Sequence, residues 1–280
     1  MPKSVWFISD YGIQDEFTGV VKAVIHSISP DSKVIDITHN IPPYQLQSGA
    51  LTLARAVRFV RPQVVLAVVD PGVGTERRRI AIEIQGEPCF LVGPDNGLLI
   101  PAAETLGGIK QAVILNNERY HFSKAGGTFD GRDIFASVTG YICQGVSLAE
   151  LGEQVDPKLL CGIDLPVVRY VKGSVVAEVI WIDNFGNAQL SVGLLELKQL
   201  DQKFASTEAA SALEIVLGLD GGSSFKTRIV KAYADLKPQE VGLVVDSYEK
   251  LSIAMYLDSA KDRLGISQGD TVSLKTLQSR

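Results

Sequence analysis

Four polar loops in the first half of the chain hold the side chains best suited to chemistry. The first three loops directly follow an apolar, strand-like run. Their carboxylates could accept hydrogen bonds from sugar hydroxyls or a proton from water, and an arginine could hold a carboxylate in place. Because ligands of open α/β sheets bind outside the carboxyl ends of the strands, we expect the loops to converge. The loops are Asp10-Tyr11-Gly12 with Asp15, Asp70-Pro71-Gly72-Val73-Gly74 with Arg77, Pro94-Asp95-Asn96-Gly97, and Phe129-Asp130-Gly131-Arg132-Asp133.

The loop from Asp70 to Arg77 follows the most apolar of these runs, Val64–Val69. A continuous β-branched run is typical of a strand that is buried on both faces of a parallel sheet. The glycines at positions 72 and 74 would let the backbone approach a ligand closely. Arg77 stands where a dinucleotide fingerprint needs its third glycine, so the loop is not that motif. The segment predicts a buried strand that opens into an active site, with Asp70 and Arg77 at its mouth.

Each polar loop also has a purely structural interpretation. Asp10 could cap a helix or form an Asx turn, and Asn96-Gly97 is a strong hairpin signal. The later segment Asp183-Asn184-Phe185-Gly186-Asn187 is turn-like, yet it offers an aromatic face and an amide that could hold a nucleobase. Taken one at a time, these residues leave both interpretations open.

The first part of the chain predicts an α/β domain over residues 1–165 with a largely parallel central sheet. Strand-like and helix-like periodicities alternate at first, and later elements add a hairpin, a strand and further helices. The expected strands are Lys3–Ser9, Lys33–Thr38, Val64–Val69, Ile80–Ile84, Cys89–Val92 and Val113–Leu115, and the expected helices are Gly19–Ser27, Gln45–Arg58, Arg132–Cys143 and Ser147–Leu151.

The pattern changes in the last part of the chain. Over residues 172–280, apolar strand-like runs are separated by polar turns, and no long helix fits. This predicts an all-β, barrel-like C-terminal domain. Its expected strands are Ser174–Ile182, Ala188–Val192, Ala212–Leu219, Thr227–Ala232, Val241–Asp246, Leu251–Met255 and Thr271–Leu274.

Composition narrows the function classes. The chain has 280 residues, 46% of them hydrophobic, and a net charge of -5, without the basic excess of a nucleic-acid binder. No apolar run is long enough to span a membrane. The three histidines and three cysteines are scattered and form no metal-binding or disulfide pattern. We expect a cytoplasmic protein with no metal, no cofactor, no nucleic-acid partner and no membrane partner.

Six segments taken in order resemble one enzyme family. They are SDYGIQDEF, DITHNIPP, VVDPGVGTER, VGPDNGLL, TFDGRDIFA and IDNFGN. They resemble the S-adenosylmethionine (SAM) hydrolases, also called SAM hydroxide adenosyltransferases, which are related to the fluorinases and chlorinases. The resemblance covers nearly the whole chain and is most specific over residues 5–140. It implies an α/β domain, a C-terminal β-barrel and a homotrimer, with active sites between the N-terminal domain of one subunit and the C-terminal domain of its neighbour.

The resemblance also implies roles for individual residues. Asp70 and Arg77 match two members of a catalytic trio, and Asp130 stands where the family usually has a histidine in the motif T-F-H-G-R-D. Asp10 matches the carboxylate that holds the ribose hydroxyls. The other residues implied to bind SAM or adenosine are Asp15, Asn96, Phe185, Asn187, Tyr233 and Ser247. Tyr248, Met255 and Tyr256 replace the more usual glycine or polar residues near the methionine end.

The implied reaction is hydrolysis of SAM to adenosine and methionine. The sulfonium departs as a neutral thioether, so the reaction needs an oriented water or hydroxide in line with ribose C5′ and a dry, positioned substrate. Asp70 would orient or deprotonate the water, and Arg77 would hold Asp70. Asp130 near Asp70 would place two carboxylates around one guanidinium, which favours a proton-sharing pair.

Three alternatives differ in class. A protein that has lost activity through the change at Asp130 would bind SAM or adenosine without turnover. A halogenase would transfer a halide, but the fluorinase carries tyrosine where Asp70 stands and serine where Gly131 stands, and a buried carboxylate repels halide. A structural protein would use all these loops only as turns, which the ordered match of several motifs disfavours.

Overall fold

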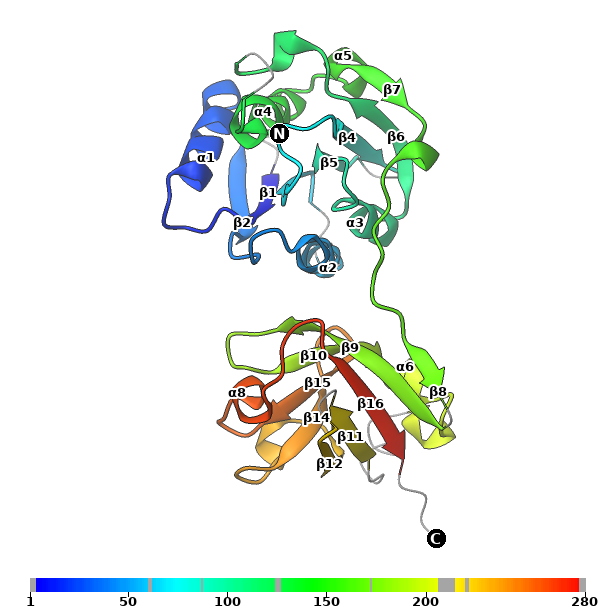
Figure 1. Cartoon of the computed structure of the whole chain (residues 1–280). Coiled ribbons are helices and arrows are strands. Elements are labelled where there is room, and N and C mark those ends of the chain that lie inside the picture. Colours follow the sequence, from blue (N-terminus) through cyan, green and yellow to red (C-terminus); the bar gives the residue numbers. More distant parts are fainter. Residues whose placement is uncertain are drawn as a thin grey trace. The chain divides into compact units, whose positions relative to one another are not determined.

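The computed structural model describes residues 4–59, 62–86, 88–123, 127–171, 173–205, 215–219 and 222–276. The chain divides into two compact units, Met1–Asp164 and Leu165–Arg280. Figure 1 shows helices around a sheet in the first unit and mostly strands in the second. No helix among the described residues is long and apolar enough to cross a membrane.

The first unit is built on a seven-stranded sheet with the order β2-β1-β3-β5-β4-β6-β7. The pairs β1–β2, β1–β3 and β3–β5 are parallel, whereas β4, β6 and β7 are added by antiparallel pairing. The predicted hairpin of β4 and β5 is confirmed, but the sheet is parallel only in one half. The strands are β1 (Ser4–Ser9), β2 (Lys33–Thr38), β3 (Val64–Val68), β4 (Arg79–Ile84), β5 (Phe90–Pro94), β6 (Ile109–Ile114) and β7 (Glu153–Val155).

Helices cover this sheet, and β3 is buried throughout, as its unbroken β-branched run predicts. The predicted helix Arg132–Cys143 begins as a π-helix, Gly131–Ala136, and continues as α4. The wider π turn is a form often found at functional sites. The α-helices are α1 (Phe17–Ile28), α2 (Leu46–Val57), α3 (Ile100–Thr105), α4 (Ser137–Cys143) and α5 (Leu148–Leu151), and the 3₁₀ turns are Glu118–Tyr120 and Pro157–Leu159.

The parallel half of the sheet brings three of the polar loops to one edge. In the pairing of these strands, Ser9 of β1 lies opposite Val68 of β3, and Leu66 of β3 lies opposite Val92 of β5. The carboxyl ends of these adjacent strands therefore lie side by side. The loops that begin at Asp10 and just after β3 and β5 leave the sheet from this edge.

The second unit holds a nine-stranded sheet in the order β12-β11-β16-β9-β10-β15-β14-β13, with β8 paired to β9. Strand β12 also packs against β14, so the sheet is barrel-like. Its strands are β8 (Arg169–Val171), β9 (Ser174–Ile182), β10 (Ala188–Gly193), β11 (Ile215–Leu219), β12 (Ser224–Thr227), β13 (Ile229–Val230), β14 (Val241–Val245), β15 (Lys250–Met255) and β16 (Thr271–Thr276).

One strand prediction in this unit needs correction, and another lies partly outside the described residues. The run Thr227–Ala232 is not one strand, because Thr227 ends β12, β13 contains only two residues, and Ala232 begins a 3₁₀ turn, Tyr233–Asp235. The first part of Ala212–Leu219 lies outside the described residues, and the rest forms β11. The described helices here are short, α6 (Leu194–Leu197), α8 (Ala260–Leu264) and the 3₁₀ turn Gln202–Ala205.

Candidate active site

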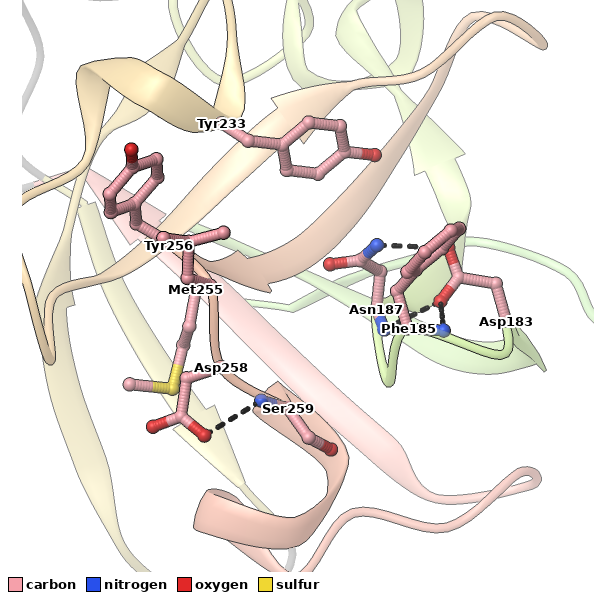
Figure 2. Close-up of a pocket in the computed structure, with 9 residues that line it drawn as sticks. Asp183, Phe185, Asn187, Tyr233, Met255, Tyr256, Asp258 and Ser259 are labelled. Carbon is pink, nitrogen blue, oxygen red and sulfur yellow. Dashed lines mark hydrogen bonds between the residues drawn. The ribbon is translucent and has the colours of Figure 1, made fainter.

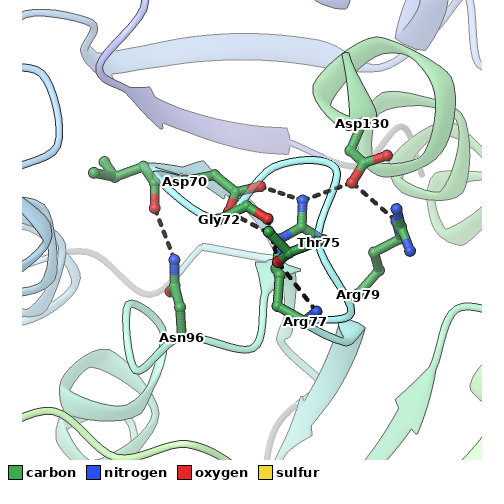
Figure 3. Close-up of polar contacts among 8 residues, drawn as sticks. Asp70, Gly72, Thr75, Arg77, Arg79, Asn96 and Asp130 are labelled. Carbon is green, nitrogen blue, oxygen red and sulfur yellow. Dashed lines mark hydrogen bonds and ion pairs between the residues drawn. The ribbon is translucent and has the colours of Figure 1, made fainter. Parts of the chain in front are cut away.

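Four charged side chains form a continuous network in the first unit (Figure 3). Arg77 donates from Nε to Asp70 Oδ1 at 2.8 Å and from Nη2 to Asp70 Oδ2, which makes this pair bidentate. The same Nη2 donates to Asp130 Oδ2 at 2.6 Å, and Arg79 Nε donates to that oxygen at 2.9 Å. We call Asp70, Arg77, Asp130 and Arg79 the charge network.

The local backbone explains why two arginines of a run of three join the network. Successive side chains of an extended segment point to opposite faces, so positions 77 and 79 share one face and position 78 takes the other. Arg78 indeed pairs with the buried Asp95 and reaches the carbonyl of Leu159. Asp130 comes from a distant segment, at the start of the π-helix.

The charge network is largely removed from water. The side chains of Asp70, Arg77 and Asp130 are 5%, 9% and 2% exposed, and that of Arg79 is 21% exposed. Burial lowers the pKa of the Arg77 guanidinium, but hydrogen bonds and charge from Asp70 and then Asp130 outweigh it, so the pKa is raised. The sequence expectation of two carboxylates around one guanidinium is incomplete, because Arg79 supplies a second cation.

A cavity of about 220 Å³ lies beside the charge network and is lined by Asp70 and Asp130. Asp10 and Tyr11 also line it, which brings the first polar loop to the same place. Burial raises the pKa of Asp10, partly offset by N–H groups that include that of Tyr44, and the charge of Asp70 adds to the rise. Burial likewise raises the pKa of the Tyr11 hydroxyl. The remaining lining residues are Phe17, Val68, Val73, Thr128, Phe129 and Gly131.

A series of polar contacts centred on the buried His39 supports the Asp10 loop. Ser9 Oγ and His39 Nδ1 lie 2.8 Å apart, and both residues are buried. His39 Nε2 lies 3.1 Å from Asp36, and the His39 carbonyl accepts the Gly12 N–H at 2.7 Å. These contacts fix the backbone on both sides of Asp10. Sequence reasoning missed them, because Ser9 and His39 carry no spacing signal.

Asn96 and Asp15, the other two binding residues predicted in the first unit, do not line this cavity. Asn96 is half-buried, and its amide donates to the Val69 carbonyl at 2.9 Å while its oxygen accepts the Leu98 N–H. This ties the β5 loop to the residue before Asp70, although each end of the amide keeps one further hydrogen-bonding position. Asp15 is exposed and does not line the cavity.

The second unit has a larger pocket of about 740 Å³ (Figure 2). Asp183 orders its polar side by accepting the Phe185 and Asn187 N–H groups and the Asn187 side-chain amide, each at 2.9 Å. Phe185 remains 80% exposed, so its ring face is available. Burial raises the pKa of the Tyr233 hydroxyl, and the charge of Asp183 adds to this.

The far side of this pocket is formed by the end of β15 and the residues that follow it. Met255, Tyr256 and Leu257 line it together with Asp258 and Ser259. The predicted residues Phe185, Asn187 and Tyr233 therefore share one cavity. Ser247 does not line it, and lies exposed in the turn between β14 and β15.

The metal prediction concerns both units. Across the described ranges, no group of three or more histidine, cysteine, aspartate or glutamate side chains is arranged to hold a metal ion. The cysteines of these ranges form no disulfide: Cys89 is buried, Cys143 is half-buried and Cys161 is exposed.

Comparison with known proteins gives a consistent result. Residues 5–152 match the N-terminal domain of the SAM hydroxide adenosyltransferases, and residues 177–273 match the C-terminal domain. A crystal structure of an uncharacterized conserved protein from Thermotoga maritima is 29% identical and superposes with a TM-score of 0.85, covering 97% of this chain and 99% of that one.

The curated relatives are SAM hydrolases and, at lower identity, fluorinases. The (R)-S-adenosyl-L-methionine hydrolase of Salinispora tropica is 38% identical over 264 residues, which is 94% of each chain. The enzyme of the same name from Methanocaldococcus jannaschii is 32% identical over 95% of this chain and 93% of its own. A fluorinase of an Actinoplanes species is 25% identical over 82% of each chain. This chain belongs to the SAM hydroxide adenosyltransferase family.

Proposed function

We propose that this protein hydrolyses S-adenosyl-L-methionine to adenosine and L-methionine. The observation that carries the proposal is the Asp70–Arg77–Asp130 arrangement beside a cavity that Asp10 also lines. The hydrolase relatives, which are 32% to 38% identical over almost the whole chain, support the same reaction. The bond that breaks joins ribose C5′ to the sulfonium sulfur, and a water oxygen forms the new bond to C5′.

Asp70 is the group best placed to handle the attacking water. Its carboxylate lies at the cavity wall and is oriented by the bidentate contact with Arg77. A carboxylate accepts a hydrogen bond from water and then the proton that water loses when it attacks carbon. The leaving group becomes neutral as it departs, so the reaction needs no proton donor on that side.

Arg77 and Asp130 act on the position of Asp70. Fixed hydrogen bonds between buried charged groups keep the reacting carboxylate in one orientation before substrate arrives, which is where the rate advantage of a preorganised site originates. Asp130 also lines the cavity, so one of its oxygens can accept from the same water.

The binding residues divide between the two units. In the first unit we assign Asp10 to the ribose hydroxyls, with Asp15 of the same loop and Asn96 of the loop after β5 as further binding residues. In the second unit we assign Phe185 and Asn187 to the adenine and Tyr233 to the methionine side, since these three line one pocket. Ser247 stays a prediction for the methionine end.

The assembly and the location remain proposals as well. Following the resemblance, we propose a homotrimer in which two copies contribute to each active site. Exposed apolar side chains in both units, such as Ile13, Tyr44 and Leu257, are the kind of surface that an assembly buries. The cytoplasmic location stays a prediction, as does the absence of a cofactor.

The direct test is incubation of the purified chain with SAM, followed by chromatography. Equal amounts of adenosine and methionine that increase with time support hydrolysis. A second incubation in ¹⁸O-labelled water should place the label in the adenosine 5′-hydroxyl, because the proposed attack is at C5′. Binding of SAM without turnover would identify the non-catalytic alternative. A 5′-halogenated nucleoside formed in the presence of halide would identify the halogenase.

A further inference from the structure

We propose that Arg79 is a positioning residue matched to Asp130, and that this pair sets where the Arg77 guanidinium lies. The proposed reaction assigns Arg79 no part, although it is the fourth member of the charge network. The inference rests on the proposed function, because its effect is measured as SAM turnover.

The geometry makes Asp130 a shared anchor. A single oxygen, Oδ2, accepts both from Arg77 Nη2 at 2.6 Å and from Arg79 Nε at 2.9 Å. Arg77 Nη2 in turn contacts Asp70. A change in the position of Asp130 therefore moves Arg77, and Arg77 in turn moves the Asp70 carboxylate. Arg79 does not line that cavity, so it acts on the reaction only through Asp130.

The charges show why Arg79 and Asp130 belong together. With Arg79 present, two carboxylates are balanced by two guanidiniums. Without it, Asp70 and Asp130 compete for the single guanidinium of Arg77. Buried charges are costly unless they are paired, so the loss of one partner disturbs the others.

A histidine at position 130 would reverse this balance. The family pattern has a histidine there, and an imidazole would leave Arg79 facing Arg77 without a carboxylate between them. Like charges repel more strongly in a buried site than in water. Arg79 is therefore suited to aspartate at position 130 and unsuited to histidine, which makes the two positions a matched pair in this chain.

The test is a double-mutant cycle with the variants Arg79→Ala, Asp130→His and Asp130→His/Arg79→Ala, with Arg79→Lys as the conservative change. We expect Arg79→Ala to lower kcat about tenfold with KM changed less than about twofold, and Arg79→Lys to recover part of the loss. Asp130→His should lower kcat about 100-fold, and removal of Arg79 in that background should raise kcat about tenfold. Lys110→Ala, which removes an exposed ion pair with Glu83 of the same sheet, is the control.

Thermal unfolding of each variant shows whether the fold is retained, and Asp130→Asn replaces Asp130→His if the latter unfolds. With Asp130→Asn, the loss from Arg79→Ala should shrink to less than about twofold, because the amide no longer balances the cation. If the variants are folded and the kcat of the double variant falls by the product of the two single losses, the pairing is overturned and the proposed function stays intact. A wild-type protein that releases no adenosine would instead overturn the proposed function. In that case the pairing is judged by the same cycle in melting temperature, where additivity counts against it.

Discussion

The pockets of the two units use their polar groups in opposite ways. In the first unit, Asp70 and Asp130 are tied to arginines and almost removed from water. In the second unit, Phe185 presents an open ring face, and Asp183 orders the turn by accepting the Phe185 and Asn187 N–H groups and the Asn187 amide. A network that is fixed before substrate arrives suits a bond-making step, whereas an open aromatic face suits binding.

The contrast teaches where substitutions should act. A change in the charge network alters groups that orient the reacting water, so it should appear mainly in kcat. A change in the pocket of the second unit removes an interaction that the bound and reacting substrate share, so it should appear mainly in KM. The predictions below test this division, beginning with the largest effect.

Asp70→Asn should abolish most of the activity. The amide keeps the shape of the carboxylate, but it cannot take a proton from water and loses the charged contact with Arg77. We expect kcat to fall by about 1,000-fold or more with KM changed only a few fold. Adenosine release at saturating SAM measures this, and Asp31→Asn, on an exposed turn, is the matched control. Activity within tenfold of wild type would remove Asp70 from the mechanism.

Phe185→Ala should raise KM and leave kcat close to wild type. Stacking of a base on an aromatic ring contributes about 1 to 3 kcal/mol, so KM should rise about tenfold or more. Because the ring is 80% exposed, its removal should not change the melting temperature. Leu195→Ala, which removes another exposed apolar side chain of the same unit, should change neither constant. A fall in kcat with KM unchanged would contradict the division between the two pockets.

How much of this division could be predicted from the sequence depended on the kind of signal. The strand Val64–Val68 and the Asp70–Arg77 loop were predicted correctly, because a β-branched run followed by a polar loop has a local cause. The hairpin of β4 and β5 was predicted, but the antiparallel addition of β6 and β7 was missed, since strand order depends on long-range pairing that a local pattern does not report. The π-helix that begins beside Asp130 has no local signature either.

The site residues divide in the same way. The sequence singled out Asp10 and Asp70 because each follows a strand, and Asn187 because its loop matched a motif; the structure places the first two at one cavity and Asn187 at the other. Arg79 was missed, although alternation along an extended run would have placed it on the face of Arg77. Asp15 and Ser247 have no structural contact with either cavity, and their roles stay predictions.

Gly131→Ala tests how closely the first cavity is packed. A Cβ at this position would lie 2.0 Å from the Tyr11 hydroxyl, and the Phe129 ring is also near. Tyr11 must therefore move from the cavity wall, which costs about 1 to 3 kcal/mol in a packed site. We expect kcat/KM to fall about fivefold and the melting temperature to fall by several degrees. Gly19→Ala is the control, because a Cβ there meets no atom within 4 Å. Equal behaviour of the two variants would show that the cavity wall adapts freely.

The smallest expected effect concerns pH and a histidine near the charge network. Burial lowers the pKa of His121 below 6.5, opposed by a backbone contact to Leu115 and by the charges of Glu118 and Asp130, while Arg79 adds to the lowering. The unfolded chain therefore binds a proton more readily than the folded chain, and stability contributed by the neutral imidazole is lost as pH falls from 6.5 toward the folded pKa. It is fully present above pH 6.5.

His121→Gln should reduce this acid sensitivity. We expect the difference in melting temperature between pH 7.5 and pH 5 to be smaller in the variant than in the wild type, because glutamine does not titrate. His26→Gln, which changes an exposed histidine of α1, should keep the wild-type difference. If the His121 variant keeps the wild-type difference in melting temperature, the acid sensitivity of this unit comes from its carboxylates. It would also show that His121 can be protonated beside the charge network without cost.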